Sequence, residues 1–469
     1  MAKIVRDEPG APLVVDLNVG DSILVDRTGH AVELELLGVK EYFVPDHWLT
    51  EDAGRVLFAS AELELRLDAT RHQVAVRPYA FPVNVAGLRL YGELTRTLTD
   101  PRELVPVGPF GHEARVSIGT RGEPWFWENG AFPIGDYRWH ASSYRNTWNS
   151  LVPYNHRYHH RGEDFGAVPD QLPVLAHQTG TIVQCPAGEA TGSNSVVVRG
   201  DDGLEMTYSH MNLGSIDPSV RPGASVAAGQ RLGATGETWL GERRQYMDPH
   251  LHVGAAWRGH RLSCYPSLVE AYFRDYGDPV LAVAGGYAFA VPGMAVRLDG
   301  TRSLTCTTSP PQRWVWTTSK GGVVAGAVAE RRYASPGHYV ERLDVFDKKG
   351  QADFDHLQVR VYDPTRGPGS EQALAYGWCY HTPVRGIRPG DEVVLWNRLE
   401  GCVEPTVMDV GDGTAPAVVG STAVHRFRAP GRYDVRFRSR SALGHPFETA
   451  MKVVVEHDSH AARAKNRWP

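Results

Sequence analysis

Residues 159–166 read HHRGEDFG and place two imidazoles and two carboxylates within eight residues. His160 and Asp164 are four residues apart, a span of about 13 Å in a straight strand, which is too far for two side chains to share one ion. Gly162 lies midway between them and permits a bend that brings them together. The stretch therefore has the composition of half a metal site, and the remaining ligands should lie elsewhere in the chain.

A second pair of histidines stands in DPHLHVG, residues 248–254. His250 and His252 are two residues apart in a strand-like context, so both side chains point to one face at a Cα spacing of about 6.6 Å. One imidazole can then bind a metal ion while the other reaches the bound water. A third histidine, His210 in MTYSHMN, would by itself be interpreted as a surface residue.

The order of these pieces is similar to that of the M23 family of zinc metallopeptidases, the lysostaphin-type endopeptidases. The family pattern is H-x(3)-D, a Y-x-H strand, a glycine-rich turn segment and H-x-H. Here the pieces read HRGED (160–164), YSH (208–210), GASVAAGQRLGATG (223–236) and HLH (250–252). The resemblance covers about residues 150–275 and implies a catalytic domain built on an antiparallel β-sheet.

The resemblance also implies a role for each histidine and for the aspartate. His160, Asp164 and His252 would be the ligands of one Zn²⁺ ion per catalytic domain, and His210 and His250 would be catalytic histidines that do not bind it. A bound zinc ion lowers the pKa of its water to about 7 and polarises a carbonyl group. One of the two histidines would move the proton to the leaving amine while the other stabilises the intermediate, and either could hold either role.

Neighbouring residues offer alternatives at this site. His156 or His159 could replace His160, but only His160 has glycine at +2 and aspartate at +4. Glu163 could replace Asp164, although its side chain should point away from the site if the segment is extended. Two tyrosines could donate hydrogen bonds to an oxyanion, and we favour aromatic packing for both. They are Tyr154 and Tyr208.

Five aromatic residues lie upstream of His160. They could wall a groove for an extended peptide, because apolar walls with a few polar groups are typical of such clefts. They could equally form a core against the N-terminal region, and we expect the core. They are Trp125, Trp127, Trp139, Tyr144 and Trp148.

The first hundred residues alternate apolar and polar side chains. Stretches such as AVELELLGV (31–39) and AELELRL (61–67) have a period of two, which is typical of half-buried antiparallel strands. The segment TDPRELVPVGPFG (99–111) is rich in proline and glycine and indicates a boundary. We predict an N-terminal β domain over residues 1–108 and a metallopeptidase domain over residues 109–277.

The sequence beyond residue 277 contains a repeat. PGHYVERLDVFDKKG (336–350) aligns without gaps with PGRYDVRFRSRSALG (430–444), at an offset of 94 residues. Two similar units rich in short strands predict tandem β-sandwiches. We place them at residues 278–364 and 365–459, followed by a tail at 460–469.

The Pro-Gly-x-Tyr strands and the turn DVGDGT (409–414) resemble the PKD family of immunoglobulin-like modules. This resemblance implies that the two units could contact polysaccharide or protein surfaces. Asp409 and Asp412 could bind calcium, but carboxylates that form the turn are the interpretation we favour.

The composition argues against several classes of protein. A net charge of -5 without a dense stripe of lysine and arginine gives no reason to expect a nucleic-acid partner. The longest uncharged stretch, residues 279–296, is interrupted by prolines and glycines, so we expect no transmembrane segment. The start, MAKIVRDEPG, shows no secretory signal peptide. Five cysteines without a C-x-x-C pair make zinc held by cysteine an unfavourable interpretation.

We therefore predict a fold that is mostly β throughout: an N-terminal β domain, a lysostaphin-type metallopeptidase domain and two PKD-like sandwiches. The predicted function is a zinc-dependent endopeptidase that hydrolyses peptide bonds. The M23 resemblance implies peptidoglycan cross-links as the substrate and an extracellular or cell-envelope location. The alternative is a non-catalytic cell-surface binding or scaffold protein that keeps the metallopeptidase fold.

Overall fold

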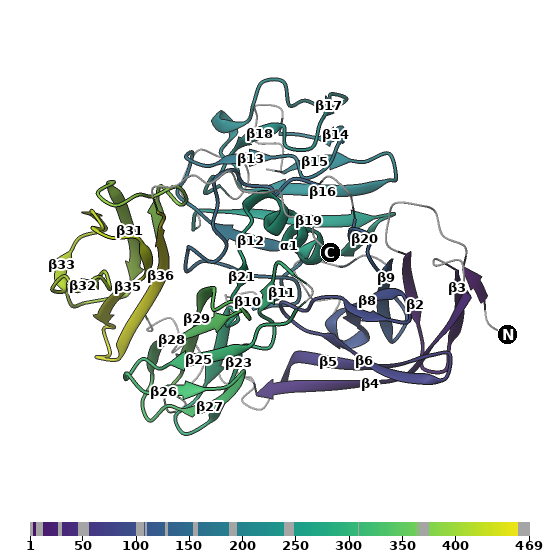
Figure 1. Ribbon diagram of the computed structural model, residues 1–469, viewed down its shortest axis with the longest axis horizontal. Helices are drawn as coiled ribbons and strands as arrows, with labels where there is room; N and C mark the ends of the chain where they lie inside the picture. Colours follow the sequence, from purple (N-terminus) through teal and green to yellow (C-terminus); the bar gives the residue numbers. More distant parts are fainter. Residues whose placement is uncertain are drawn as a thin grey trace.

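The computed structural model is built mainly of β-strands, which confirms the predicted fold class (Figure 1). The only α-helix among the described residues is α1 (Tyr265–Tyr276), and two short 3-10 helices are η1 (Arg96–Thr99) and η2 (Leu213–Ser215). No helix among them is long and apolar enough to span a membrane. The structure describes residues 3–5, 13–26, 31–45, 56–99, 107, 110–126, 130–152, 158–186, 195–238, 248–307, 309–363, 365 and 375–457.

The N-terminal part consists of two sheets around one hydrophobic core. The larger sheet contains, in spatial order, β1 (Lys3–Val5), β3 (Ser22–Asp26), β4 (Ala31–Pro45), β5 (Val56–Leu67) and β6 (Thr70–Val76). The smaller sheet contains, in spatial order, β2 (Leu13–Leu17), β9 (Ala114–Thr120), β8 (Leu88–Thr95) and β7 (Val83–Val85).

The predicted alternation is visible in the burial of these strands. Ala61, Leu63 and Leu65 of β5 are buried, and the glutamates between them are not. Each buried leucine contributes about 1.5–3 kcal/mol relative to an exposed one, so the alternation fixes which face of the sheet points inward. β9 pairs with β2 and β8, so the N-terminal sheet continues beyond residue 108. Residue 108 itself lies outside the described residues, and the domain limits remain a prediction.

The central part is an antiparallel sheet with α1 on one face (Figure 1). In spatial order its strands are β12 (Glu163–Gly166), β19 (His250–Trp257), β16 (Leu204–Ser209), β15 (Val196–Arg199), β14 (Gly180–Gln184) and β17 (Ser225–Val226), with β20 (His260–Leu262) paired to β19. Two small ladders accompany this sheet. They are β10 (Leu151–Val152) with β11 (Tyr158–His159), and β13 (Pro173–Leu175) with β18 (Arg231–Ala234).

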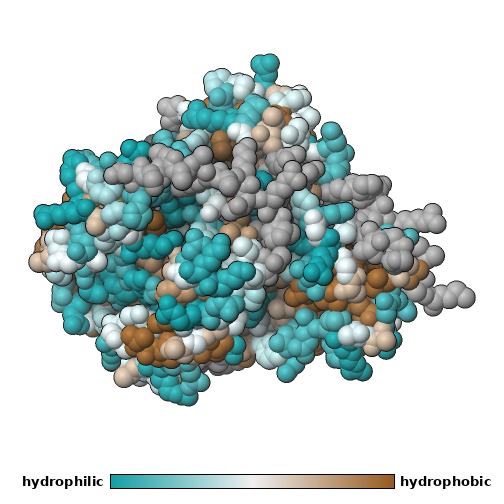
Figure 2. Space-filling view, in the orientation of Figure 1, coloured by the Kyte–Doolittle hydropathy of each residue, from teal (hydrophilic) through white to brown (hydrophobic). Residues whose placement is uncertain are grey.

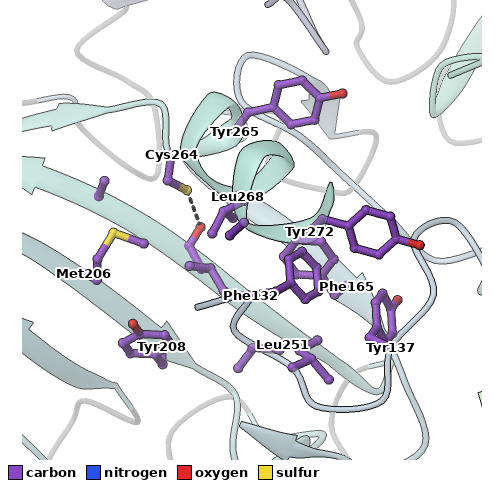
Figure 3. Close-up of a cluster of buried hydrophobic side chains, with 14 of the residues drawn as sticks. Phe132, Tyr137, Phe165, Met206, Tyr208, Leu251, Cys264, Tyr265, Leu268 and Tyr272 are labelled. Carbon is purple, nitrogen blue, oxygen red and sulfur yellow. Dashed lines mark hydrogen bonds between the residues drawn. The ribbon is translucent and has the colours of Figure 1, made fainter. Parts of the chain in front are cut away.

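The sheet has an apolar face and a polar face because side chains alternate along each strand. Phe165 of β12 and Leu251 of β19 belong to the buried cluster against α1, together with Tyr272 of the helix (Figure 3). The helix ends at Gly277, whose φ of 62° is in the left-handed region that favours glycine. Residues 164, 250 and 252 are therefore directed to the opposite face of the same strands.

The C-terminal part contains two units of strands that share one large sheet. In spatial order this sheet contains β22 (Tyr287–Ala290), β29 (Ala352–Val361), β28 (Gly337–Phe346), β36 (Pro446–Val455), β35 (Gly431–Arg440), β32 (Thr406–Asp409) and β33 (Ala417–Val419). In addition, β25 (Arg313–Thr317) pairs with β28, and β26 (Val323–Ala325) pairs with β25. Smaller sheets complete the units. They are β21 (Val280–Leu281) with β24 (Leu304–Thr305), β23 (Ala295–Asp299) with β27 (Val328–Arg332), and β30 (Tyr376–Thr382) with β31 (Val393–Glu400) and β34 (Thr422–His425).

The sequence repeat corresponds to equivalent strand pairs. β28 and β35 begin 94 residues apart, and so do β29 and β36. The first unit meets the second where β28 pairs in parallel with β36, with His338 opposite Phe447. The two units are therefore joined edge to edge, and their assignment as PKD-like modules remains a prediction.

The carboxylates of the DVGDGT turn bond to their own backbone. Asp409 Oδ1 accepts the N–H of Gly411 at 3.0 Å, and Asp412 Oδ1 accepts the N–H of Thr414 at 2.9 Å. Asp412 Oδ2 also pairs with His425 Nε2 at 2.7 Å. These bonds support the turn-forming interpretation over a calcium site.

An exposed apolar patch lies at the lower edge of the face shown in Figure 2. Figure 2 shows a mainly hydrophilic face with an apolar patch at its lower edge, over β26 and β27, where Val323, Val324 and Val328 are exposed. The five cysteines all lie among the described residues, and all of them are free thiols.

Candidate metal centre

The antiparallel pairing of β12 with β19 brings the two histidine-containing stretches together. Asp164 lies directly opposite His252 in this ladder. His160 stands just before β12, and the chain bends at Gly162, as the sequence predicted. A Cβ atom at residue 162 would lie 2.4 Å from the carbonyl oxygen of Val253 and 2.6 Å from Cε1 of His252. Only glycine lets the chain pass this close to the neighbouring strand.

Three ligand atoms converge on one point. His160 Nε2 lies 3.0 Å from Asp164 Oδ1, His252 Nδ1 lies 2.9 Å from the same oxygen, and the two nitrogens are 3.0 Å apart. Tetrahedral zinc with bonds of about 2.0–2.1 Å would separate its ligand atoms by roughly 3.4 Å, so the set fits such an ion after a small expansion. Among the described residues, no other three side chains of His, Cys, Asp or Glu bring their ligand atoms together in this way.

Hydrogen bonds behind the ligands fix their orientation. His160 Nδ1 lies 2.9 Å from the Gly162 carbonyl oxygen, which can only accept, so Nδ1 donates and Nε2 faces the centre. Asn146 Nδ2 donates to Asp164 Oδ2 at 2.8 Å, which leaves Oδ1 for the centre. Partners of this kind raise the affinity of a metal site. Asn146 was missed by the sequence analysis, because no spacing relates it to Asp164.

The other two histidines stand beside the same point, with the ring of His210 6.0 Å from that of His252. His250 Nδ1 donates to the carbonyl oxygen of Asp248 at 2.7 Å, and its Nε2 lies 3.6 Å from Asp164 Oδ1. His210 Nδ1 donates to the carbonyl oxygen of Thr238 at 3.0 Å. The ring centroids of His210 and His250 are 4.7 Å apart. The structure thus gathers all five residues singled out from the sequence.

The backbone at His210 is unusual for a residue with a side chain. Its φ is 71°, in the left-handed region, where a non-glycine residue is strained. The facing residue is Gly236, where a Cβ atom would lie 2.4 Å from the carbonyl oxygen of His210. The glycine of the predicted GATG turn therefore makes room for the strained turn that directs the imidazole to the centre.

Burial sets the protonation of these groups. It lowers the pKa of His252 to about 4, and it lowers the pKa of His250 and, together with the neighbouring histidines, that of His210. These rings are therefore neutral at neutral pH, which is the form that binds a metal ion or accepts a proton. Burial alone would raise the pKa of Asp164, but the facing His160 and His250 and two hydrogen bonds hold it well below its ordinary value.

The alternative ligands are directed elsewhere. His159 is buried against the N-terminal part, with Nε2 3.4 Å from the carbonyl oxygen of Phe58. Glu163 accepts hydrogen bonds from Thr147 Oγ1 at 2.8 Å and from the N–H of Trp148 at 3.1 Å. It points away from the centre, as expected for the neighbour of Asp164 in a strand. His156 and Tyr154 lie outside the described residues.

The aromatic residues divide between core and centre. Trp125, Trp139 and Trp148 are buried in hydrophobic clusters, as expected, and Trp127 lies outside the described residues. The hydroxyl of Tyr208, a buried residue, accepts the N–H of His177 at 2.6 Å, which supports a packing role. Tyr144 is also buried, in a small cluster with Trp378, and its ring in addition lies 4.5 Å from that of His250.

Residues 158–264 match the model of Peptidase family M23, and this segment contains all five residues of the centre. The resemblance to M23 found in the sequence is thereby confirmed for this part of the chain. Comparison with the curated proteins gave no match.

Solved structures similar to this chain include two peptidases. A putative glycyl-glycine endopeptidase lytM from Ruminococcus gnavus ATCC 29149 is 22% identical, with a TM-score of 0.23, over 30% of this chain and 59% of that one. This chain thus spans little more than half the length of that protein. The antimicrobial peptidase lysostaphin from Staphylococcus simulans is 16% identical, with a TM-score of 0.24, over 51% of this chain and 96% of that one.

Proposed function

We propose that this protein is a zinc-dependent endopeptidase that hydrolyses peptide bonds in peptidoglycan cross-links. The observation that carries the proposal is the convergence of His160, Asp164 and His252, with mutual distances of about 3 Å between their ligand atoms. His210 and His250 stand beside this point, inside the segment that matches Peptidase family M23. We assign the first three residues as zinc ligands and the other two as catalytic histidines.

The chain's own residues can carry the proton transfers of peptide hydrolysis. When bound, zinc would supply an activated water and a Lewis acid for the scissile carbonyl. His250 is neutral, is held by the Asp248 carbonyl, and can accept a proton on Nε2. His210 is held in the same way by Thr238, and its Nε2 can carry the proton to the leaving amine or stabilise developing charge.

The peptidoglycan substrate and the extracellular or cell-envelope location are part of the same proposal. They rest on the M23 match and on the motifs that the chain shares with this family. We further propose that the two C-terminal units are PKD-like modules that contact polysaccharide or protein. The alternative of a non-catalytic scaffold is disfavoured, because every ligand and catalytic position of the motif is occupied by the residue type that turnover needs.

Metal analysis and a wall-hydrolysis assay on the same purified proteins test the proposal. We expect wild type to hold about one zinc per chain and to release peptide fragments from peptidoglycan. His160→Ala should lose the zinc, while His250→Ala should keep it and lose activity by about 10²–10⁴-fold. His159→Gln is the matched control and should keep both. Wild type that binds zinc and cleaves no wall preparation would support the scaffold instead.

A further inference from the structure

Residues 142–146, which we call the bridging segment, run along the outer edge of β12. The carbonyl oxygens of Tyr144 and Asn146 accept the N–H groups of Gly166 and Asp164 at 3.1 and 3.0 Å. A Cβ atom at Gly166 would lie 2.1 Å from Ser142 Oγ, so this glycine permits the close approach. The bridging segment therefore extends the catalytic sheet by a strand-like edge next to Asp164.

The opposite edge of the bridging segment is bonded to β30 of the second C-terminal unit. The N–H of Ser143 donates to the carbonyl oxygen of Cys379 at 3.1 Å, and Ser143 Oγ accepts the N–H of Cys379 at 2.7 Å. Figure 1 shows this second unit, marked by β31 and β36, beside the end of the catalytic sheet that carries β12. The bridging segment is thus held between the centre and a unit more than 200 residues away in sequence.

Side chains of the bridging segment alternate between the two sides. Asn146 donates to Asp164, and the ring of Tyr144 lies against His250. Arg145 points the other way, into the first C-terminal unit, where its guanidinium pairs with Asp355. The same guanidinium also donates to the carbonyl oxygens of Gly285 and His356.

The second C-terminal unit supplies a ring behind Tyr144. Trp378 of β30 is 3% exposed and packs edge-on against Tyr144, with ring centroids 5.4 Å apart. Its indole N–H donates to the hydroxyl of Tyr287 at 3.3 Å. The neighbouring Cys379 belongs to the core of the second unit, so Trp378 lies on the face that an independent sandwich would expose to water. Here that face is covered by the catalytic domain.

We infer that the two C-terminal units are structural parts of the active site, and that Trp378 and Arg145 are positioning residues for it. Trp378 holds Tyr144 against His250, and Arg145 fixes the backbone from which Asn146 reaches Asp164. Misplacement of a catalytic group by about 1 Å can cost about 10²-fold in rate, so residues outside the centre can control it. The inference rests on the proposed function for the reaction, but its effect on the metal site can be measured without turnover.

The first experiment measures kcat and KM for full-length variants of β30. We expect Trp378→Ala to lower kcat by about 10- to 100-fold with KM changed by less than about threefold, because Trp378 is buried behind Tyr144. Trp378→Phe, which keeps a ring beside Tyr144, should recover most of the activity. Tyr376→Ala, two residues along the same face and next to Trp378, is the matched control and should stay within about twofold of wild type. An unchanged kcat in Trp378→Ala, or an equal loss in Tyr376→Ala, would overturn the role of Trp378.

The second experiment titrates metal-free protein with Co²⁺ and follows its visible absorption, which requires no substrate. Asn146→Ala and Arg145→Met should both weaken Co²⁺ binding by about 10- to 100-fold, whereas Trp378→Ala should change it by less than about threefold. Far-UV circular dichroism confirms that each variant is folded. If only Asn146→Ala weakens binding, the link through Arg145 is wrong. If wild type cleaves no peptide, the proposed function fails, and this titration still decides the positioning of Asp164.

Discussion

Two buried groups of ionisable residues in this protein balance the charge of a buried aspartate in different ways. At the junction between the central part and the C-terminal units, Asp278 lies 3.2 Å from Arg138 Nη1 and also pairs with Arg385. In the candidate metal centre, Asp164 faces the imidazole nitrogens of His160 and His252 instead. A buried carboxylate is costly unless its charge is balanced, so the two groups need different counter-charges.

The difference explains why one group is structural and the other can bind an ion. Burial would raise the pKa of Asp278, but Arg138 and Arg385 hold it well below its ordinary value, so the junction carries its own permanent cations. The histidines around Asp164 offer lone pairs in place of permanent charge, because burial lowers the pKa of His252 to about 4. A divalent metal ion fits the second arrangement, since it supplies the positive charge that the side chains lack.

Removal of the metal should have the largest effect and tests whether the centre depends on an ion while the junction does not. We expect treatment with a chelator to reduce wall hydrolysis by at least about 10³-fold, and one equivalent of Zn²⁺ to restore it, because the activated water depends on the ion. The same treatment of Asp278→Asn should give the same relative loss, since Arg138 and Arg385 already supply the positive charge at the junction. Activity that survives complete loss of metal would contradict the assignment of the centre.

Disruption of the junction should give the next largest effect, and it should act on stability. Asp278→Ala leaves Arg138 and Arg385 buried without their carboxylate, and we expect a loss of about 3–5 kcal/mol in the free energy of unfolding. Urea unfolding measures this change, and zinc content should stay at the wild-type level. Arg426→Met, which removes an exposed pair with Glu392, is the matched control and should cost less than about 1 kcal/mol.

A buried histidine outside the centre, His177, should make the free energy of unfolding depend on pH. His177 Nδ1 donates to the carbonyl oxygen of Ala131 at 2.6 Å, and its Nε2 accepts from Ser267 Oγ at 2.7 Å. Burial lowers its pKa to about 4. The unfolded chain takes up a proton at His177 near pH 6.5, and the folded chain does not. The contribution of neutral His177 to the free energy of unfolding is therefore complete above this pH and is lost as the pH falls toward 4.

From pH 7 to pH 5, His177 should account for about 2 kcal/mol of the decrease in the free energy of unfolding. Urea unfolding of wild type and His177→Gln at the two pH values measures this contribution as a difference. The variant should lose less stability than wild type on acidification. An equal loss in both proteins would show that His177 is protonated in the folded state.

The smallest effect concerns the DVGDGT turn. Asp412→Ala removes the bonds to Thr414 and His425, and we expect a loss of about 1 kcal/mol in the free energy of unfolding. Calcium should leave the melting temperature of wild type unchanged, because the turn carboxylates already have protein partners. A calcium-dependent rise that disappears in Asp412→Ala would favour the metal-binding alternative instead.

The sequence was sufficient to predict that His160, Asp164 and His252 lie close together. His160, Asp164 and His252 stand in motifs whose spacing relates them to strands, and Gly162 marks the bend that the structure contains. The alternation of β5 and the repeat of β28 and β35 were predicted for the same reason. Each of these signals is local, and a period of two or a fixed offset survives in the sequence whatever surrounds the strand.

The partners of the centre could not be predicted in this way. Asn146 and Tyr144 belong to a segment, residues 142–146, whose sequence SSYRN has no alternation of apolar and polar residues. Their contacts with Asp164 and His250 depend on the path of the bridging segment along β12. From the sequence we expected Tyr144 in an aromatic core and the C-terminal units as tandem β-sandwiches. The structure places Tyr144 at the centre and joins the second unit to it through Trp378.

The sequence by itself determined which side chains are candidate ligands, the order in which they follow one another, and the alternation of faces along the strands that carry them. Only the tertiary structure decided what covers the faces of those strands, and hence that Trp378 of the last unit packs behind Tyr144, whose ring lies against His250. The physical reason is that alternation along a strand is a property of neighbouring residues. The partner that buries a face is chosen by packing between segments that are hundreds of residues apart.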